Sequence, residues 1–354
     1  MKLVFILAAI LIFGLLIAVH EFGHFITAKL CGVRVNEFAI GMGPLIFQKE
    51  KGETLYSLRA LPIGGFCAME GEDEDTGDER SFVRQGFLKK FLILVAGSFM
   101  NFVAGVCILL VLHSNAVGFN VDAIAGVAPE FSRTGENGLE AGDLVYKVDG
   151  YRTFVYGDSR LFLTYADESV DIEVVRDGRH ILLEDVTRQT YTAMDGSTYT
   201  GFGIYLGVTT IPADLGAKLK FTCYAAADYV QMVWFSLAAL FNGGATVEDL
   251  SGPVGIVSTI TEVGASADTT REAWSRVFYF AALLAVNLAV MNLLPIPALD
   301  GGRIFFLAID AIALLFFKRK VPEKYQAVIN TAGFLLLMGF MLLITFKDVF
   351  QILR

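Results

Sequence analysis

The sequence predicts a polytopic α-helical membrane protein with four transmembrane helices, a membrane-associated β-hairpin and one inserted β-rich α+β domain. Hydrophobic residues make up 55% of the 354 residues and charged residues only 18%. The mean hydropathy of +0.57 is well above that of a soluble globular chain. Four apolar stretches reach the roughly 20 residues that a helix needs to cross a bilayer. Between the second and third stretches the chain becomes more charged and alternates polar with apolar residues, as strands do.

The first transmembrane helix is expected at the N-terminus, where a long apolar run begins at Leu3. A secretory signal would need a small-residue cleavage site after a shorter core, whereas His20 and Glu21 follow the run directly. We therefore expect a retained helix that continues to about residue 30. A shorter run at 304–317 carries Asp310 and is expected to form a buried or interfacial helix. The other three spans are expected at residues 91–112, 277–294 and 327–346.

Basic residues predict the orientation, because they are enriched in cytosolic loops beside the spans. The loops expected on the cytosolic side carry Lys29, Arg34, Lys89, Lys90, Lys318, Arg319, Lys320 and Lys324. The opposite side carries a weaker and partly contrary set, namely Lys2, Arg271, Arg276, Lys347 and Arg354. Both termini and the long segment between spans 2 and 3 are therefore expected to be extracytosolic.

Composition also excludes some classes of function. The net charge of -9 arises partly from the acidic stretch at 70–79, which is expected to be a solvated loop, and it argues against nucleic-acid binding. The four cysteines are scattered without metal-type spacing, so neither a disulfide framework nor a cysteine metal site is indicated.

A metal-binding pattern lies within the first helix. His20, Glu21 and His24 fit H-E-x-x-H, and residues four apart share one helix face, so both imidazoles can bind one zinc ion. Glu21 is offset by about 100° and can reach the water that zinc activates. Ionisable side chains are costly at membrane depth, which favours a function for all three. The alternative is a pair of interhelical hydrogen bonds with Glu21 at a helix end, which would leave the intramembrane carboxylate unexplained.

A catalytic zinc site takes a third protein ligand, and the best candidate is Asp300 in the segment NLLPIPALDGGR. Asp300 follows the expected start of span 3 by enough residues to reach a depth comparable with that of the histidines. Pro295 and Pro297 forbid a regular helix and free backbone groups, which is tolerable only where the chain is buried or lines a wet cavity. His113 and His180 fall on the other side of the membrane. A simple turn that ends the helix is the alternative interpretation of this segment.

The segment from residue 115 to about 211 resembles one PDZ domain. Its first part, NGLEAGDLVYKVDGYRT, has a buried Leu139, a Gly-Asp turn and a strand, and its second part is a hairpin that turns at Asp177-Gly178. A generic β-rich domain is the alternative. PDZ folds bind extended chain ends by strand addition, for which the stretch 124–127 is the candidate. The following segment, 217–241, fits an amphipathic helix at the outer membrane surface.

Together these motifs resemble the site-2 protease family of intramembrane zinc metalloproteases, in particular the bacterial regulator-of-sigma-E protease type with a PDZ module between spans 2 and 3. The resemblance rests on H-E-x-x-H on span 1 and Asn292-x-x-Pro295-x-Pro297-x-Leu299-Asp300-Gly301 on span 3. It extends to LSGPVGI at 250–256 and to the four-span layout. Two motifs in the right order on separate spans make it specific.

The resemblance implies a site and a reaction. It implies that His20, His24 and Asp300 bind Zn²⁺, that Glu21 is the general base, and that Asn292 contacts the substrate backbone. Asn287 matches a second polar position of the family, although either asparagine could instead form an interhelical hydrogen bond. The implied substrates are single-span membrane proteins within the lipid bilayer of the bacterial cell membrane, such as trimmed anti-sigma factors and remnant signal peptides.

Between the first two spans the sequence predicts the β-hairpin. The runs PLIFQ and TLYSLRAL flank KEKGE, a turn-like insert that contains Gly52. A substrate helix must unwind before its peptide bonds can be cut, and the hairpin edge could pair with the extended segment. Gly41 and Gly43, like Gly64 and Gly65, would permit close approach of the substrate backbone, or else only mark turns.

These expectations divide the chain at the following boundaries: spans 1 and 2 with the hairpin at 1–114, the PDZ domain at 115–212, an extracytosolic amphipathic helix and linker at 213–270, and spans 3 and 4 with the LDG motif at 271–354. The PDZ domain is expected either to bind peptide or to exclude long ectodomains. Two other functions remain open: a transporter or metal-binding channel, and a PDZ scaffold with an inactive site. The carboxylate of Glu21 favours hydrolysis, because transport needs no general base.

Overall fold

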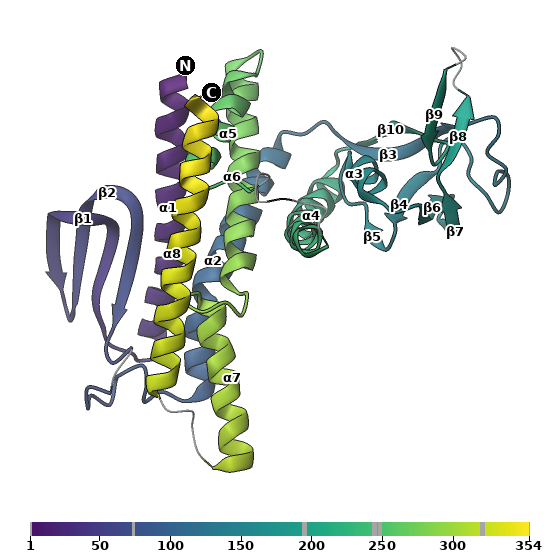
Figure 1. Cartoon of the computed structure of the whole chain (residues 1–354). Coiled ribbons are helices and arrows are strands. Elements are labelled where there is room, and N and C mark those ends of the chain that lie inside the picture. The colour runs from purple at the N-terminus through teal and green to yellow at the C-terminus, as the bar shows by residue number, and fades with distance from the viewer. Residues whose placement is uncertain are drawn as a thin grey trace. The chain divides into compact units, whose positions relative to one another are not determined.

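A computed structural model of the chain describes residues 2–72, 75–192, 197–242, 246, 250–318 and 323–353. The chain folds into two compact units. Unit 1 comprises Met1–Ile108 and Val233–Arg354, and unit 2 comprises Leu109–Met232 (Figure 1). The helices α2 and α4 each contribute residues to both units.

Within the described part of the chain, four helices are long and apolar enough to cross a membrane, which confirms the expected number of candidate spans. They are α1 (Lys2–Leu30), α2 (Phe87–Ser114), α6 (Thr270–Asn292) and α8 (Glu323–Leu353). The apolar run at 304–317 belongs to a longer helix, α7 (Asp300–Phe317). The expected buried or interfacial position of α7 stays a prediction; its last turn is not covered by the described part of the chain, because Leu315 and Phe316 are 75% and 73% exposed. The basic residues Arg319 and Lys320 lie outside the described residues.

Among the described residues of unit 1, two apolar core clusters include side chains of α1. In the first, Phe5 and Leu16 of α1 pack with Ile260 of α5 (Pro253–Ala265) and Val277 of α6. In the second, Ala28 lies with Val33, Phe38 and Ile93 where the β1–β2 sheet meets α1 and α2. Burial of such side chains contributes about 1.5–3 kcal/mol each for the larger ones, so α1 is anchored along much of its length.

A side chain of α8 caps the N-terminus of α5. The buried carboxylate of Asp348 accepts hydrogen bonds from the amides of Gly252 and Gly255, each at 2.8 Å. The first amides of a helix lack intrahelical partners, and this carboxylate satisfies two of them. A Cβ on either glycine would lie within 3.0 Å of Asp348 Oδ2, which explains the glycines of the SGPVG segment.

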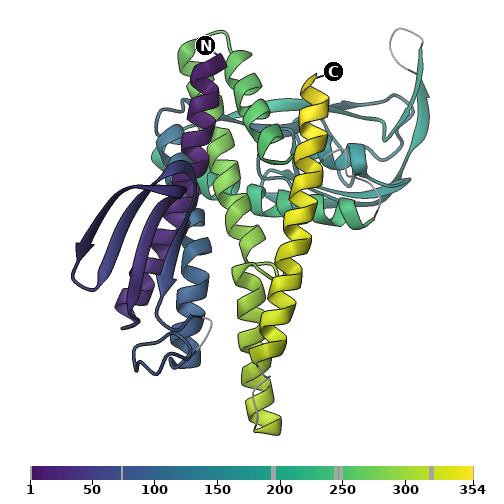
Figure 2. The same cartoon turned by 60° about the vertical axis from the view of Figure 1, so that its left-hand side comes forward.

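The expected β-hairpin is present and is larger than the sequence indicates. β1 (Val35–Lys51) and β2 (Thr54–Met69) turn at Gly52, where Lys51 pairs with Thr54. Both strands also fold back on themselves, so that Phe38 pairs with Tyr56 on one side and with Cys67 on the other. The resulting order of segments is 61–69, 35–42, 54–59 and 45–51. The sheet lies alongside α1 in two views (Figures 1 and 2).

Unit 2 is built on an antiparallel sheet with the strand order β10-β3-β4-β6-β7, in which the short strand β5 also pairs with β4. A short helix, α3 (Asp158–Tyr165), and the first part of α4 (Leu215–Phe241) complete it. The strands are β3 (Gly118–Val127), β4 (Leu144–Val148), β5 (Tyr151–Arg152), β6 (Ser169–Arg176), β7 (Arg179–Thr187), β8 (Gln189–Thr192), β9 (Thr198–Gly201) and β10 (Ile204–Pro212).

Several expected features of this unit are present. Leu139 is buried, with 1% of its surface exposed, and β6 turns into β7 at Asp177-Gly178, where both residues have positive φ. The expected peptide-binding stretch, 124–127, is wrong. It lies in β3, which pairs with β10 on one side and with β4 on the other, so β3 is an interior strand, and the edges of the described sheet are β10 and β7. The sequence alone does not reveal this strand order.

Candidate metal centre

Two imidazoles face one point because α1 is regular through the H-E-x-x-H motif. His20 and His24 are buried, with 9% and 7% of their surfaces exposed, and their Nε2 atoms lie 3.2 Å apart. The Nδ1 atom of His24 lies 2.8 Å from the carbonyl oxygen of Ile93 in α2. A carbonyl only accepts, so this Nδ1 carries the proton and leaves the Nε2 lone pair free.

Asp300 reaches the same point through a tight turn between α6 and α7. Helix α6 ends at Asn292, and Asp300 is the first residue of α7. A Cβ on Gly301 would lie 2.2 Å from the carbonyl oxygen of Leu294, and one on Gly302 would lie 2.4 Å from that of Ile296. The two glycines therefore let α7 begin directly against the turn, which is the physical reason for the D-G-G sequence.

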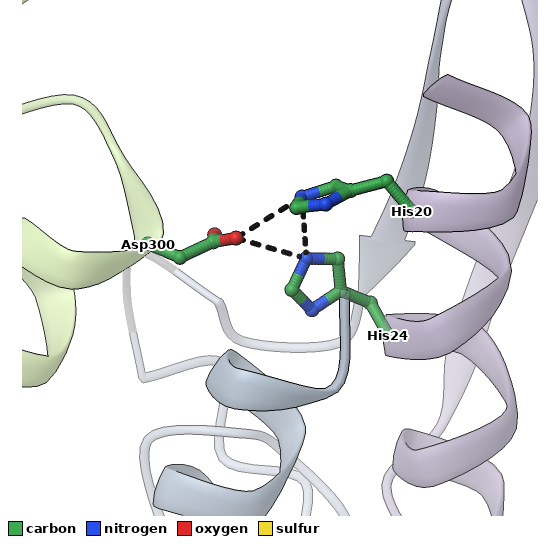
Figure 3. A group of neighbouring side chains, drawn as sticks. All are labelled: His20, His24 and Asp300. Carbon is green, nitrogen blue, oxygen red and sulfur yellow. Dashed lines mark hydrogen bonds and ion pairs between the residues drawn. The ribbon is translucent and has the colours of Figure 1, made fainter. Parts of the chain in front are cut away.

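The three side chains converge from α1 and α7 (Figure 3). Oδ2 of Asp300 lies 3.0 Å from Nε2 of His20 and 3.3 Å from Nε2 of His24. Ligands at 2.0–2.1 Å from a tetrahedral zinc ion lie about 3.3 Å from one another. Two neutral nitrogens and one carboxylate are also a donor set that zinc accepts, with a fourth position left for water. The residues thus fit a catalytic zinc ion, and no other such group of three is found among the described residues.

Helix α2 packs against the two histidines, a contact that the sequence analysis did not predict. Ile93, Gly97 and Asn101 are spaced by four and share one helix face. Asn101 is buried, and its Nδ2 lies 3.4 Å from Nδ1 of His20. A polar residue inside an apolar span is a signal that could have identified Asn101. Gly97 carries no such signal, because glycine is common in transmembrane helices.

Glu21 lies between the metal cluster and the sheet. It follows His20 directly on α1 and is partly buried. Its Cγ would lie 3.5 Å from a Cβ built on Gly65 of β2. The carboxylate therefore stands next to both the imidazoles and the segment 61–69, whose outer side has no strand partner among the described residues.

Asn292 and Asn287 occupy different faces of α6. The Nδ2 atom of Asn292 lies 3.5 Å from Nδ1 of His20, so Asn292 is at the cluster. Five residues along a helix correspond to a rotation of about 140°, so Asn287 cannot face the same point. A substrate contact of Asn287 remains a prediction.

The predicted glycines lie at a bend of the sheet. Gly41 and Gly43 have φ values of +85° and +80°, and a Cβ on Gly41 would lie 2.6 Å from the carbonyl oxygen of Leu61. This bend between the segments 35–42 and 45–51 accounts for both residues. Their role as substrate contacts is still a prediction. The two remaining histidines contact other groups: His113 contacts Thr222, and His180 contacts Glu173.

Comparison with known proteins agrees with this geometry. The sequence profile described as peptidase family M50 matches residues 8–340. A Clostridium perfringens protein that carries the name zinc metalloprotease is 38% identical over 348 residues, which cover 98% of each chain. The zinc metalloprotease RasP of Shouchella clausii is 31% identical over 97% of this chain and 98% of its own length. The regulator of sigma-W protease RasP of Bacillus subtilis is 27% identical over the same shares.

Proposed function

We propose that this chain, which belongs to peptidase family M50, the site-2 protease family, hydrolyses peptide bonds in or near the transmembrane segments of single-span membrane proteins. Its family makes it a zinc-dependent protease of membrane-bound substrates. The observation that carries the proposal is the meeting of His20, His24 and Asp300 at hydrogen-bonding distances within a bundle of apolar helices. Such a group at membrane depth indicates a functional site.

The side chains of this site have separate roles in the reaction. His20, His24 and Asp300 hold the zinc ion, which supplies Lewis acidity toward the water and the scissile carbonyl when bound. Glu21, beside His20, takes a proton from the attacking water and gives it to the leaving amine. Asn292, at the cluster, donates its amide hydrogens to the substrate backbone once the substrate helix has unwound.

The β1–β2 sheet presents the substrate to the site. Segment 61–69 is an edge that runs beside α1, close to Glu21 through Gly65. An extended substrate segment that adds to this edge would have its backbone groups paired where the helix no longer pairs them. Large apolar side chains on the sheet, among them Ile46 and Phe47, are 64% and 59% exposed, which suits a sheet in contact with lipid.

Unit 2 acts on the substrate outside the membrane as a PDZ domain. Its edge strand β10 lies opposite α3 across a cavity of about 80 Å³ lined by Asp122, Tyr156, Gly157, Arg160, Leu206 and Gly207. A groove between an edge strand and a helix is where a PDZ fold adds an extended peptide. The domain either binds a peptide there or excludes substrates whose ectodomains are still long.

The cellular setting follows from the charge pattern and from the relatives. Both termini and unit 2 are extracytosolic, and the metal centre is toward the cytosolic side of the bacterial cell membrane. Trimmed anti-sigma factors and remnant signal peptides are the substrates, in keeping with the relative named regulator of sigma-W protease.

The test is Glu21→Gln in the purified full-length protein, with a tagged single-span substrate in detergent or in vesicles. We expect cleavage to fall at least a hundredfold while one equivalent of zinc is retained, because glutamine cannot accept the proton but leaves the ligands intact. A chelator should abolish cleavage by the wild-type enzyme, and zinc should restore it. Unchanged cleavage by Glu21→Gln would reject the assignment of the base.

A further inference from the structure

Two amide side chains face Nδ1 of His20. Asn101 approaches from α2 with Nδ2 at 3.4 Å, and Asn292 approaches from the end of α6 with Nδ2 at 3.5 Å. His24 differs, because its Nδ1 faces the backbone carbonyl of Ile93 at 2.8 Å. The orientation of His20 is therefore set by side chains, whereas that of His24 is set by the main chain.

The chemistry of a ligating imidazole requires an acceptor at this position. His20 directs Nε2 toward His24 and Asp300, so Nε2 is the atom that would bind the ion. A neutral imidazole with a free Nε2 lone pair carries its proton on Nδ1. That N–H must donate, and an amide NH₂ group cannot accept it. One of the two amides must therefore turn its oxygen toward His20.

Burial indicates which amide provides the oxygen. Asn101 is 1% exposed, and its buried Oδ1 has no hydrogen-bond partner among the residues that the structure describes. Asn292 is only partly buried, so water or a substrate can satisfy its amide. The oxygen and nitrogen of an asparagine are exchanged by a flip of the amide plane. This flip in Asn101 would give its oxygen a partner and would give the His20 proton an acceptor.

We propose that Asn101 is a positioning residue of the metal centre, with its Oδ1 accepting a hydrogen bond from Nδ1–H of His20. The inference rests on the proposed zinc ligands. Helix α2 then supplies the outer partner of both histidines, through the Ile93 carbonyl for His24 and through the Asn101 oxygen for His20. Asn292 keeps its amide hydrogens for the substrate, so metal binding and substrate binding depend on different asparagines.

Loss of such an outer partner typically weakens metal affinity 10–100-fold, because the ligand loses its fixed tautomer and ring orientation. The experiment measures the zinc Kd of the full-length protein in detergent by competition with a chromophoric chelator. We expect Asn101→Leu, which has a similar volume but no acceptor, to raise the Kd by 10–100-fold. Asn101→Asp, which keeps oxygens toward His20, should bind zinc within about threefold of the wild type.

Two further variants show whether a negative result rejects the proposed zinc ligands or only the role of Asn101. Asn292→Leu should retain the wild-type zinc Kd and lose cleavage. His20→Ala should lose zinc binding, and retention of zinc by this variant would overturn the proposed ligands rather than the role of Asn101. If His20→Ala loses zinc but Asn101→Leu does not, or if Asn101→Asp is as weak as Asn101→Leu, the role of Asn101 is overturned. Asn101→Ala replaces the leucine variant if thermal unfolding shows that the latter is not folded.

Discussion

A Cβ atom on Gly97 would lie 2.4 Å from Nε2 of His24. The same atom would lie 2.8 Å from Nε2 of His20, so the backbone of α2 passes directly beside the two nitrogens that face Asp300. Real Cβ atoms do not approach heavy atoms this closely. The absence of a side chain at residue 97 is therefore a condition for the imidazole pair to exist in this arrangement.

The substitution Gly97→Ala should disrupt the metal centre. Its methyl group would displace one or both imidazoles from the position shared with Asp300, and we expect zinc affinity and cleavage to fall together by at least about tenfold. Chelator competition and a cleavage assay on the same preparation measure both quantities. Gly339→Ala on α8 is the matched control, because nothing lies within 4 Å of its added methyl group. An unaffected Gly97→Ala enzyme would contradict this account.

The contact between Gly14 and Pro62 offers a test of substrate presentation by the sheet. A Cβ on Gly14 would lie 2.1 Å from the carbonyl oxygen of Pro62, so Gly14→Ala must push segment 61–69 away from α1. We expect cleavage to fall about tenfold or more while the zinc Kd is unchanged, because displaced reactants lose their orientation while the proposed ligands lie further along α1 and on α7. Leu11→Ala, at a residue that is 64% exposed on the same helix, should leave both unchanged. Full cleavage by Gly14→Ala would argue against the edge as the docking strand.

Removing the cap that Asp348 of α8 provides for α5 should lower the stability of the protein without a direct effect on metal binding. Asp348→Ala leaves the buried amide of Gly252 and the partly buried amide of Gly255 without their acceptor, which should cost about 1–3 kcal/mol. Thermal unfolding in detergent measures this cost. Asp348→Asn keeps an acceptor oxygen and should recover most of the stability. Equal losses in the two variants would show that the charge, and not the acceptor, is what α5 requires.

Local signals in the sequence were enough to identify the four candidate spans and the three converging side chains. Hydropathy indicates each span separately, and the H-E-x-x-H spacing puts His20 and His24 on one face whatever the helix packs against. Asp300 could be predicted because the Pro-rich turn and the depth along span 3 bring it to the histidines. The prediction needed no knowledge of how the helices are arranged around them.

The features that the sequence did not reveal depend on tertiary packing. Ile93 acts through its backbone carbonyl, and Gly97 acts through the absence of a side chain, so neither residue type signals its role. The pairing of Phe38 with both Tyr56 and Cys67 and the edge position of β10 are properties of strand order. Strand order depends on contacts between distant segments, and no local pattern specifies it.

A buried acid in unit 2 makes the stability of the protein depend on pH. Asp228 of α4 is 4% exposed, and its Oδ1 has no hydrogen-bond partner among the described residues. Burial, and secondly the charge of Asp158 on α3, raise the pKa of Asp228 to about 8. Burial also raises the pKa of Asp158 to about 6. Gln231 exchanges hydrogen bonds with the backbone of Arg152 one turn further along α4, so Asp228 lies where α4 joins the sheet.

The sign of this pH dependence follows from proton binding. Between about pH 4, the ordinary pKa of an aspartate, and pH 8 the folded state holds a proton on Asp228 that the unfolded state has released, so stability falls as the pH rises. Asp228→Asn removes the titrating group, and we expect it to stabilise the protein by roughly 1–3 kcal/mol at pH 8.5 and by much less at pH 5. Thermal unfolding in detergent at the two pH values checks this difference, with Asp268→Asn as the control because Asp268 is exposed. If Asp228→Asn changed the melting temperature equally at both pH values, the proton on Asp228 could not be the cause.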